Sequence, residues 1–226
     1  WRVRRTWRVR RTWRVRRTPR WSPTRGRRHH PCAGDLIAVE LDVGTLRIVA
    51  GRLRGRRLRV PPDSALRPTS ERVREALFNI LGQDLSGFDV LDLFAGSGAL
   101  GFEALSRGAR RAVFVEANPM TAAALRRSAE AFGLEHETRV IVGRVESVLD
   151  RARLGGPYHV IFADPPYDAT AEAGLVDGID TGRLLGMHGT LVVERESRNP
   201  LNLGRLGLKL TRTAEYGRTA LDFFKY

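Results

Sequence analysis

From residue 67 onwards, short apolar runs alternate with longer stretches in which apolar residues recur every three or four positions. The short runs predict buried strands at Asp89–Phe94, Ala112–Glu116, Arg139–Val142, His159–Ala163 and Gly189–Arg195. The longer stretches predict helices at Ala99–Arg107, Met120–Phe132, Glu146–Leu154 and Thr170–Ile179. A closing pair of strands is expected near Leu208–Glu215 and Arg218–Lys225. Strands alternating with helices are typical of an α/β fold, so we expect a doubly wound, Rossmann-like, mostly parallel sheet with an antiparallel C-terminal hairpin.

The segment before this pattern predicts a small β-hairpin followed by a helix. Apolar positions from Leu46 to Val60, interrupted by Gly51 and Gly55, favour a hairpin within residues 45–66. The next helix starts after Arg67, with Thr69 or Ser70 as its N-cap, and ends at Gly82. Residues 67–226 would then form the main domain.

Arginines are concentrated in the hairpin and the helix after it. Residues 46–74 contain nine arginines against two acidic residues. Each guanidinium can make bidentate hydrogen bonds to phosphate oxygens, which favours contact with RNA or DNA. Alternatively, the charges could only protect an exposed edge strand from pairing with other strands. We expect the following residues to contact nucleic acid: Arg52, Arg54, Arg56, Arg57, Arg67, Arg72 and Arg74.

The net charge of +14 comes mostly from residues 1–34, which hold 13 arginines and no acidic residue. The remainder carries 26 Lys and Arg against 25 Asp and Glu. The chain opens with three copies of the hexapeptide WRVRRT, a period that matches no core-forming repeat. This could be an arginine-rich arm whose tryptophans stack on bases, or a translated nucleotide repeat upstream of the true start. In both cases we expect residues 1–44 to be a disordered tail.

Composition narrows the class of protein further. No apolar run reaches 18 residues and no signal peptide is visible, which predicts a protein that does not enter the membrane. The single cysteine, Cys32, argues against a disulfide framework and a thiolate metal site, and isolated histidines add no metal ligands, so we expect no metal. A cytoplasmic location is expected.

The segment Val90–Gly101, VLDLFAGSGALG, predicts a strand that runs into a glycine turn and a helix. The free N–H groups at the start of such a helix favour a nucleotide cofactor. The spacing of Gly96, Gly98 and Gly101, with Glu116 later, also fits a dinucleotide site. However, Asp92 would repel a pyrophosphate and suits a cationic ligand such as S-adenosylmethionine. The turn alone leaves both cofactors open.

The motif Asp164-Pro165-Pro166-Tyr167 directly follows the predicted strand His159–Ala163. Two successive prolines cannot continue a strand ladder and fix a rigid turn. The Asp164 carboxylate and the Pro165 carbonyl could accept both N–H groups of an exocyclic amine, while the Tyr167 ring stacks on the base. A dehydrogenase has no use for this arrangement, which therefore favours amine methylation.

These motifs together resemble the bacterial 16S ribosomal RNA guanine-N2 methyltransferase family. The resemblance rests on RIVAGRLRGRRL, RPTSERVREALFNIL, VLDLFAGSGALGFEALSRGA, FVEAN and DPPY, and covers about residues 46–226. It implies direct transfer from S-adenosylmethionine to a guanine amine, with Asp164, Pro165, Pro166 and Tyr167 at the reacting amine. The cofactor residues that it implies are Asp92, Phe94, Ala95, Gly96 and Gly98 at the methionine end, Glu116 at the ribose, and Ala117, Asn118 and the backbone at Val145 at the adenine.

The resemblance further implies a monomer whose partner is 16S rRNA, alone or within the 30S subunit or an assembly intermediate. Because DPPY serves several amines, a DNA adenine or cytosine methyltransferase is an alternative. An NAD-dependent oxidoreductase is an alternative from another class, supported by the glycine spacing and Glu116. A basic RNA-binding protein without catalysis is a further one.

Overall fold

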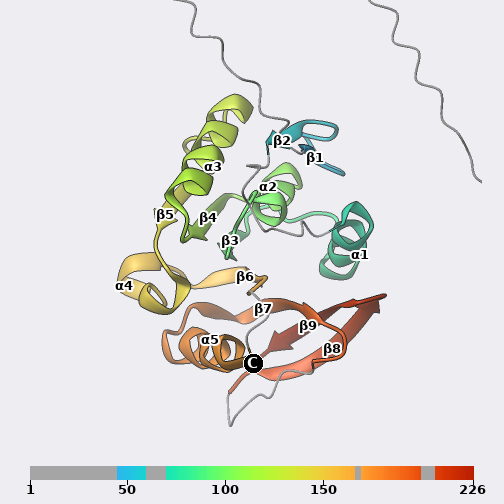
Figure 1. The fold of residues 1–226 in the computed structure, drawn as a ribbon. Helices are drawn as coiled ribbons and strands as arrows, with labels where there is room; N and C mark the ends of the chain where they lie inside the picture. The colour runs from blue at the N-terminus through green and yellow to red at the C-terminus, as the bar shows by residue number, and fades with distance from the viewer. Residues whose placement is uncertain (1–44, 60–69, 166–168, 200–206) are drawn as a thin grey trace, which may run out of the picture. The chain divides into compact units, whose positions relative to one another are not determined.

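The computed structural model describes residues 45–59, 70–165, 169–199 and 207–226. Most of the described residues from 89 onwards are organised around one seven-stranded sheet with the strand order β5-β4-β3-β6-β7-β9-β8 (Figure 1). Its strands are β3 (Asp89–Leu93), β4 (Arg111–Glu116), β5 (Thr138–Val142), β6 (Tyr158–Ala163), β7 (Leu185–Glu196), β8 (Lys209–Tyr216) and β9 (Thr219–Lys225). The first five strands in this order pair in parallel, whereas β9 pairs antiparallel with both β7 and β8. The predicted fold class, with its antiparallel end, is therefore confirmed.

Helices cover both faces of the sheet, as expected for a doubly wound fold. They are α1 (Glu71–Leu81), α2 (Ala99–Ser106), α3 (Pro119–Phe132), α4 (Arg151–Leu154) and α5 (Ala169–Thr181). Successive side chains of β3 alternate between the faces: Val90 packs with α1, α2 and α3, whereas Leu91 and Leu93 pack with α4 and α5. We call these the α2 face and the α5 face. None of the described helices is long and apolar enough to cross a membrane.

The helix predicted over Glu146–Leu154 is wrong in its extent. A single 3₁₀ turn at Val145–Ser147 (η1) is followed by the separate short helix α4. Asp150 lies at the break, and its side chain accepts a hydrogen bond from the Ala152 N–H at 2.6 Å. An aspartate that binds the backbone two residues ahead starts a new helix rather than continuing an old one. Elsewhere the predicted strands and helices match within a few residues, and Ser70 is the N-cap of α1.

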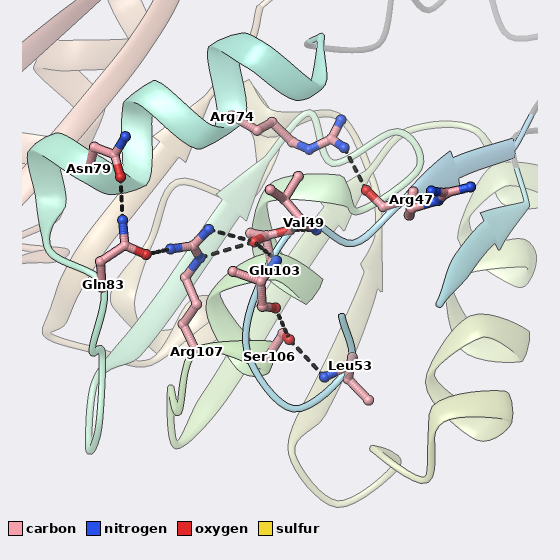
Figure 2. A network of polar contacts seen from close by, with 10 residues as sticks. Arg47, Val49, Leu53, Arg74, Asn79, Gln83, Glu103, Ser106 and Arg107 are labelled. Atoms are coloured by element: carbon pink, nitrogen blue, oxygen red, sulfur yellow. Dashed lines mark hydrogen bonds and ion pairs between the residues drawn. The ribbon is translucent and has the colours of Figure 1, made fainter. Parts of the chain in front are cut away.

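The N-terminal hairpin, residues 45–59, consists of β1 (Thr45–Arg47) paired antiparallel with β2 (Arg57–Arg59). Its strands are shorter than predicted because residues 48–56 form a turn packed on helix α2. Glu103 of α2 is fully buried and accepts the N–H groups of Val49 at 2.8 Å and Ala50 at 2.9 Å (Figure 2). The same carboxylate forms a buried ion pair with Arg107 at 2.8 Å. The hairpin is therefore held by the helix that starts at the glycine turn.

Candidate functional site

The glycine turn after β3 adopts backbone angles that few side chains favour. Phe94 has a φ of 59°, which is unusual for a bulky residue, and Gly96 and Gly98 have φ of 53° and 74°. Gly98 is the N-cap residue of α2. A Cβ on Gly98 would lie 2.5 Å from Leu125 and 2.9 Å from Phe102, so packing against α2 and α3 also requires glycine there. Strain concentrated at one turn is typical of a ligand-binding loop.

Asp92 lies beneath this turn on the α2 face. Its Oδ2 accepts the Gly101 N–H at 2.9 Å, so the carboxyl group binds one of the free N–H groups of the first turn of α2. Burial, and then the nearby charge of Glu116, raise the pKa of Asp92 to about 8. Asp92 is thus fixed as a partner of the helix, and any contact with a cofactor would be additional to this bond.

Glu116, at the end of β4, joins the turns that follow two neighbouring strands. Its Oε2 accepts the Gly96 N–H at 2.9 Å, and its Oε1 accepts the Asn118 N–H at 2.8 Å. The Asn118 side chain accepts the Met120 N–H at 2.8 Å and so caps α3. Ala117 and Asn118 are exposed at this edge, whereas Val145 is buried in η1. The acidic group predicted for ribose therefore lies against the glycine turn.

Asp164 and Pro165 follow β6, the strand next to β3 in the sheet. The pairing of Leu93 with Ala163 places Asp164 at the edge of the sheet where the glycine turn begins. Burial, then the charges of Glu194 and Asp92, raise the pKa of Asp164 to about 8. Pro166 and Tyr167 lie outside the described residues.

Glu194 on β7 is a residue that the sequence analysis did not single out. It is a buried carboxylate, 8% exposed, and its charge acts on Asp164. The sequence did contain a signal for it: β7 ends with LVVERE, which places an acidic residue within an otherwise apolar strand. Charged residues are rare inside buried strands.

The predicted arginines other than Arg74 fall into three groups. Arg54, Arg57 and Arg72 are exposed. Arg52 is half exposed and forms an ion pair with Glu137, while Arg56 donates to the Ala131 carbonyl and lies 4.9 Å from the centre of the Phe132 ring. The latter two connect the hairpin to α3 and the loop that follows it. Arg67 lies outside the described residues.

Arg74 is a correction to the predicted set of nucleic-acid contacts. Its side chain is buried, 1% exposed, and its guanidinium donates to the Arg47 carbonyl at 2.7 Å (Figure 2). Burial lowers its pKa, against the opposing charges of Glu103 and Glu71. Helical periodicity places this position on the inner side of α1, so Arg74 holds the hairpin to α1 instead of facing a partner.

Comparison with known proteins gives consistent matches over this region. A family model described as conserved hypothetical protein 95 matches residues 46–225. Ribosomal RNA small subunit methyltransferase D of Escherichia coli K12 is 34% identical over 80% of this chain and 90% of its own length. Putative rRNA methyltransferase YlbH of Bacillus subtilis is 33% identical over 80% of this chain and 98% of its own. The solved structure of the putative methyltransferase yhhF from Escherichia coli is similar, with a TM-score of 0.70 and 32% identity over 80% of this chain and 97% of that one.

Proposed function

Because the chain belongs to the conserved hypothetical protein 95 family of small-subunit ribosomal RNA methyltransferases, we propose that it methylates the N2 amine of a guanine in 16S rRNA, with S-adenosylmethionine as the methyl donor. The observation that carries the proposal is the position of Asp164, at the end of β6 beside the glycine turn after β3. One edge of the sheet thus holds acceptors for an amine next to a cofactor turn, as ligand sites in open α/β sheets do.

The residues at this edge suit S-adenosylmethionine better than a dinucleotide. The acidic side chains of Asp92, Glu116 and Asp164 offer no counter-charge to a pyrophosphate, whereas they can ionise beside the cationic sulfonium and ammonium groups of the methyl donor. In the proposal, Glu116 holds the ribose hydroxyls, and Ala117, Asn118 and the backbone at Val145 surround the adenine. Asp92 and the turn of Phe94, Ala95, Gly96 and Gly98 bind the methionine end.

The methyl donor supplies an electrophilic methyl group, and the protein supplies position and charge. The Asp164 carboxylate and the Pro165 carbonyl accept the two N–H groups of the amine, which directs the nitrogen lone pair towards the cofactor turn. The same carboxylate stabilises the positive charge that develops on nitrogen. In well-aligned reactions, orientation of this kind can supply about 7–11 kcal/mol of the barrier. The base must leave its stack to enter the pocket, where Tyr167 would stack on it.

We assign RNA binding to the N-terminal extension and methyl transfer to the domain that follows it. Residues 45–66 form the RNA-binding extension, with Arg54 and Arg57 exposed on the hairpin, and residues 67–226 form the methyltransferase domain as a monomer. Arg72 on α1 is exposed too, and so are Arg52 and Arg56 on the hairpin. In the proposal these arginines and Arg67 also contact the RNA. The partner in this proposal is 16S rRNA in the 30S subunit or an assembly intermediate.

The test measures transfer of labelled methyl groups from S-adenosylmethionine to three acceptors: naked 16S rRNA, 30S subunits and DNA. Product nucleosides separated by mass should contain N2-methylguanosine. Asp164→Ala should lower transfer by at least about 100-fold, because the amine loses its acceptor. The same variant should bind S-adenosylhomocysteine with nearly unchanged affinity by calorimetry.

Three results would contradict the proposal. Methylated adenine or cytosine in DNA would favour the DNA enzyme, and calorimetric binding of NAD in place of S-adenosylhomocysteine would favour an oxidoreductase. Near-normal turnover by Asp164→Ala would remove Asp164 from the mechanism.

A further inference from the structure

Two neighbouring strands bring acidic residues together, one directly after β6 and the other near the end of β7. β6 and β7 lie side by side (Figure 1) and pair in parallel, with Phe162 opposite Val192 and Ala163 opposite Val193. One residue further along, the chain carries Asp164 after β6 and Glu194 on β7. Since side chains alternate between faces along a strand, Glu194 lies on the α2 face, where Val192 belongs to the core. The charges of Glu194 and Asp92, both on this face, act on Asp164.

The charged groups around Asp164 come from several packed elements. β7 contributes Glu194 and β3 contributes Asp92, and these two carboxylates act on Asp164. Helix α1 packs on β6 through Phe78, whose ring lies 5.8 Å from that of Phe162, but its Arg74 donates to the Arg47 carbonyl on the hairpin.

The next residue on β7 forms its ion pair on the other face of the sheet. Arg195 points to the α5 face, where its Nε donates to Asp222 of β9 at 2.6 Å. Across β9, the residue opposite Glu194 is Leu221, which carries no charge. Among these described neighbours, the groups that act on Asp164 are therefore acidic.

We propose that Glu194 is a positioning residue of the methyl-transfer site, whose carboxylate beside Asp164 makes Asp164 the acceptor of the proton that the amine must lose. The inference rests on the proposed function and adds the fate of this proton. The nitrogen lone pair forms the C–N bond while the C–S bond breaks, and its electron pair stays on sulfur. The nitrogen then carries the positive charge until an N–H bond breaks, its electron pair returns to nitrogen, and the proton passes to an Asp164 carboxylate oxygen.

Burial, and then the neighbouring charge of Glu194, give Asp164 the basicity for this task. An isolated carboxylate holds a proton weakly near neutral pH, whereas one beside a second buried carboxylate holds it more tightly. Asp164 must be ionised to accept the proton, so activity should rise as the pH rises through its pKa. Removing the charge of Glu194 should lower that pKa, and the acidic limb of the pH–activity profile should move to lower pH.

The experiment compares wild-type protein with Glu194→Gln, Glu194→Asp and Glu196→Gln. Titration of protein labelled with ¹³C in its aspartate carboxyl carbons follows the Asp164 signal, which is assigned with Asp164→Asn. In wild type the midpoint should lie well above the usual aspartate range. Glu194→Gln should move the midpoint, and the acidic limb of kcat, down by about one pH unit or more.

Two variants serve as controls. Glu194→Asp keeps the charge and should keep a raised midpoint. Glu196→Gln removes a carboxylate from the same face of the same strand and should leave the midpoint in place. An unchanged midpoint in folded Glu194→Gln would overturn the inference. If that variant does not fold, a wild-type Asp164 midpoint near 4 would overturn it as well.

The two proposals can fail separately. Absence of transfer to rRNA by wild-type protein would contradict the proposed function, whatever the carboxylate titration shows. Normal transfer to rRNA with the same pH profile in wild type and Glu194→Gln would contradict only the role of Glu194.

Discussion

Two aspartates on strand β3 show how position on one strand sets opposite electrostatic behaviour. Asp92, at the carboxyl end, is buried, and its pKa is raised to about 8. Asp89, at the other end, is also buried, but its bonds from Arg110 at 2.9 and 2.6 Å and the charge of Arg111 outweigh desolvation and lower its pKa. At the end that carries the glycine turn, burial thus disfavours the charged form of Asp92, whereas at the other end the arginines favour the charged form of Asp89.

This contrast predicts different effects of pH on stability. Between about pH 4 and about pH 8, Asp92 keeps its proton in the folded protein but loses it in the unfolded protein. The free energy of unfolding of wild type should therefore fall as the pH rises through this range. Asp92→Asn keeps an acceptor for the Gly101 N–H but removes this loss. The free energy of unfolding of Asp92→Asn relative to wild type should therefore increase by more than about 1 kcal/mol between pH 5 and pH 8. Urea unfolding at both pH values measures it.

Asp89→Asn is the matched control on the same strand. In wild type the ionised form of Asp89 is stabilised in the folded state. Its contribution to the free energy of unfolding is therefore present above the unfolded pKa and is lost as the pH falls through the lower folded pKa. Asp89→Asn should be less stable than wild type at pH 7 and approach it in acid. Parallel pH curves for wild type and Asp92→Asn would contradict the raised pKa of Asp92.

Helix α2 is the element that connects the glycine turn after β3 to the arginine-rich hairpin. Its first turn is bound by Asp92, and its later turns hold the hairpin through Glu103 and Ser106. Ser106 accepts the Leu53 N–H on its hydroxyl at 2.9 Å and the Arg52 N–H on its carbonyl at 2.8 Å. The hairpin is therefore placed by the same helix that begins at the proposed methyl-donor site.

Two glycines of the hairpin give a test of this docking. Gly51 and Gly55 both have positive φ, 77° and 84°. A Cβ on Gly51 would lie 1.9 Å from the Ser106 carbonyl oxygen, whereas a Cβ on Gly55 would have nothing within 4 Å. Gly55→Ala should cost about 1–2 kcal/mol from its φ alone. Gly51→Ala should cost at least about 2 kcal/mol more, because the turn must leave α2.

Thermal and urea unfolding of both variants measure the difference. Equal losses would mean that the hairpin does not pack on α2 as described. Binding of S-adenosylhomocysteine should survive both substitutions, since neither residue lies at the proposed methyl-donor site.

At the scale of the whole molecule, folding divides the arginine-rich region into structural and exposed residues. Arg74 is buried, and Arg52 and Arg56 bind neighbouring elements. Of the hairpin arginines predicted to contact nucleic acid, Arg54 and Arg57 are exposed, and Arg47 beside them is exposed as well. The position of a cation after folding, rather than its presence in the sequence, decides whether it can reach a phosphate.

The double variant Arg54→Gln/Arg57→Gln should weaken RNA binding and lower its salt dependence. If each arginine contacts one phosphate, the slope of log K against log salt should fall by about 1.5. Filter binding to 16S rRNA fragments at several salt concentrations measures the slope.

Arg139→Gln/Arg153→Gln removes the same charge from β5 and α4 and serves as the control. Arg139 pairs with Val113, which packs on the α5 face, and α4 packs on that face too, whereas the hairpin packs on the α2 face. Equal slopes for the two double variants would contradict a specific role for the hairpin.

Much of the fold followed from the sequence because its signals are local. The alternation of buried strands and amphipathic helices predicted the doubly wound sheet, and glycines and prolines at strand ends marked the two turns of the site. The motifs along residues 46–226 also identified the methyltransferase family, which the comparisons confirm. The helix over Glu146–Leu154 was predicted wrongly because Asp150 starts a new helix within an otherwise suitable pattern.

By itself, then, the chain determined its elements, its family and the residues of its two motifs, since these depend on neighbours within a few positions. Only the tertiary structure decided that Glu194 lies beside Asp164, that Glu103 holds the hairpin, and that Arg74 faces inwards. These depend on strand register and helix packing between residues 20 or more positions apart, and no local pattern encodes such pairings. The sequence shows which side chains can ionise, and packing decides which of them lie close enough to interact.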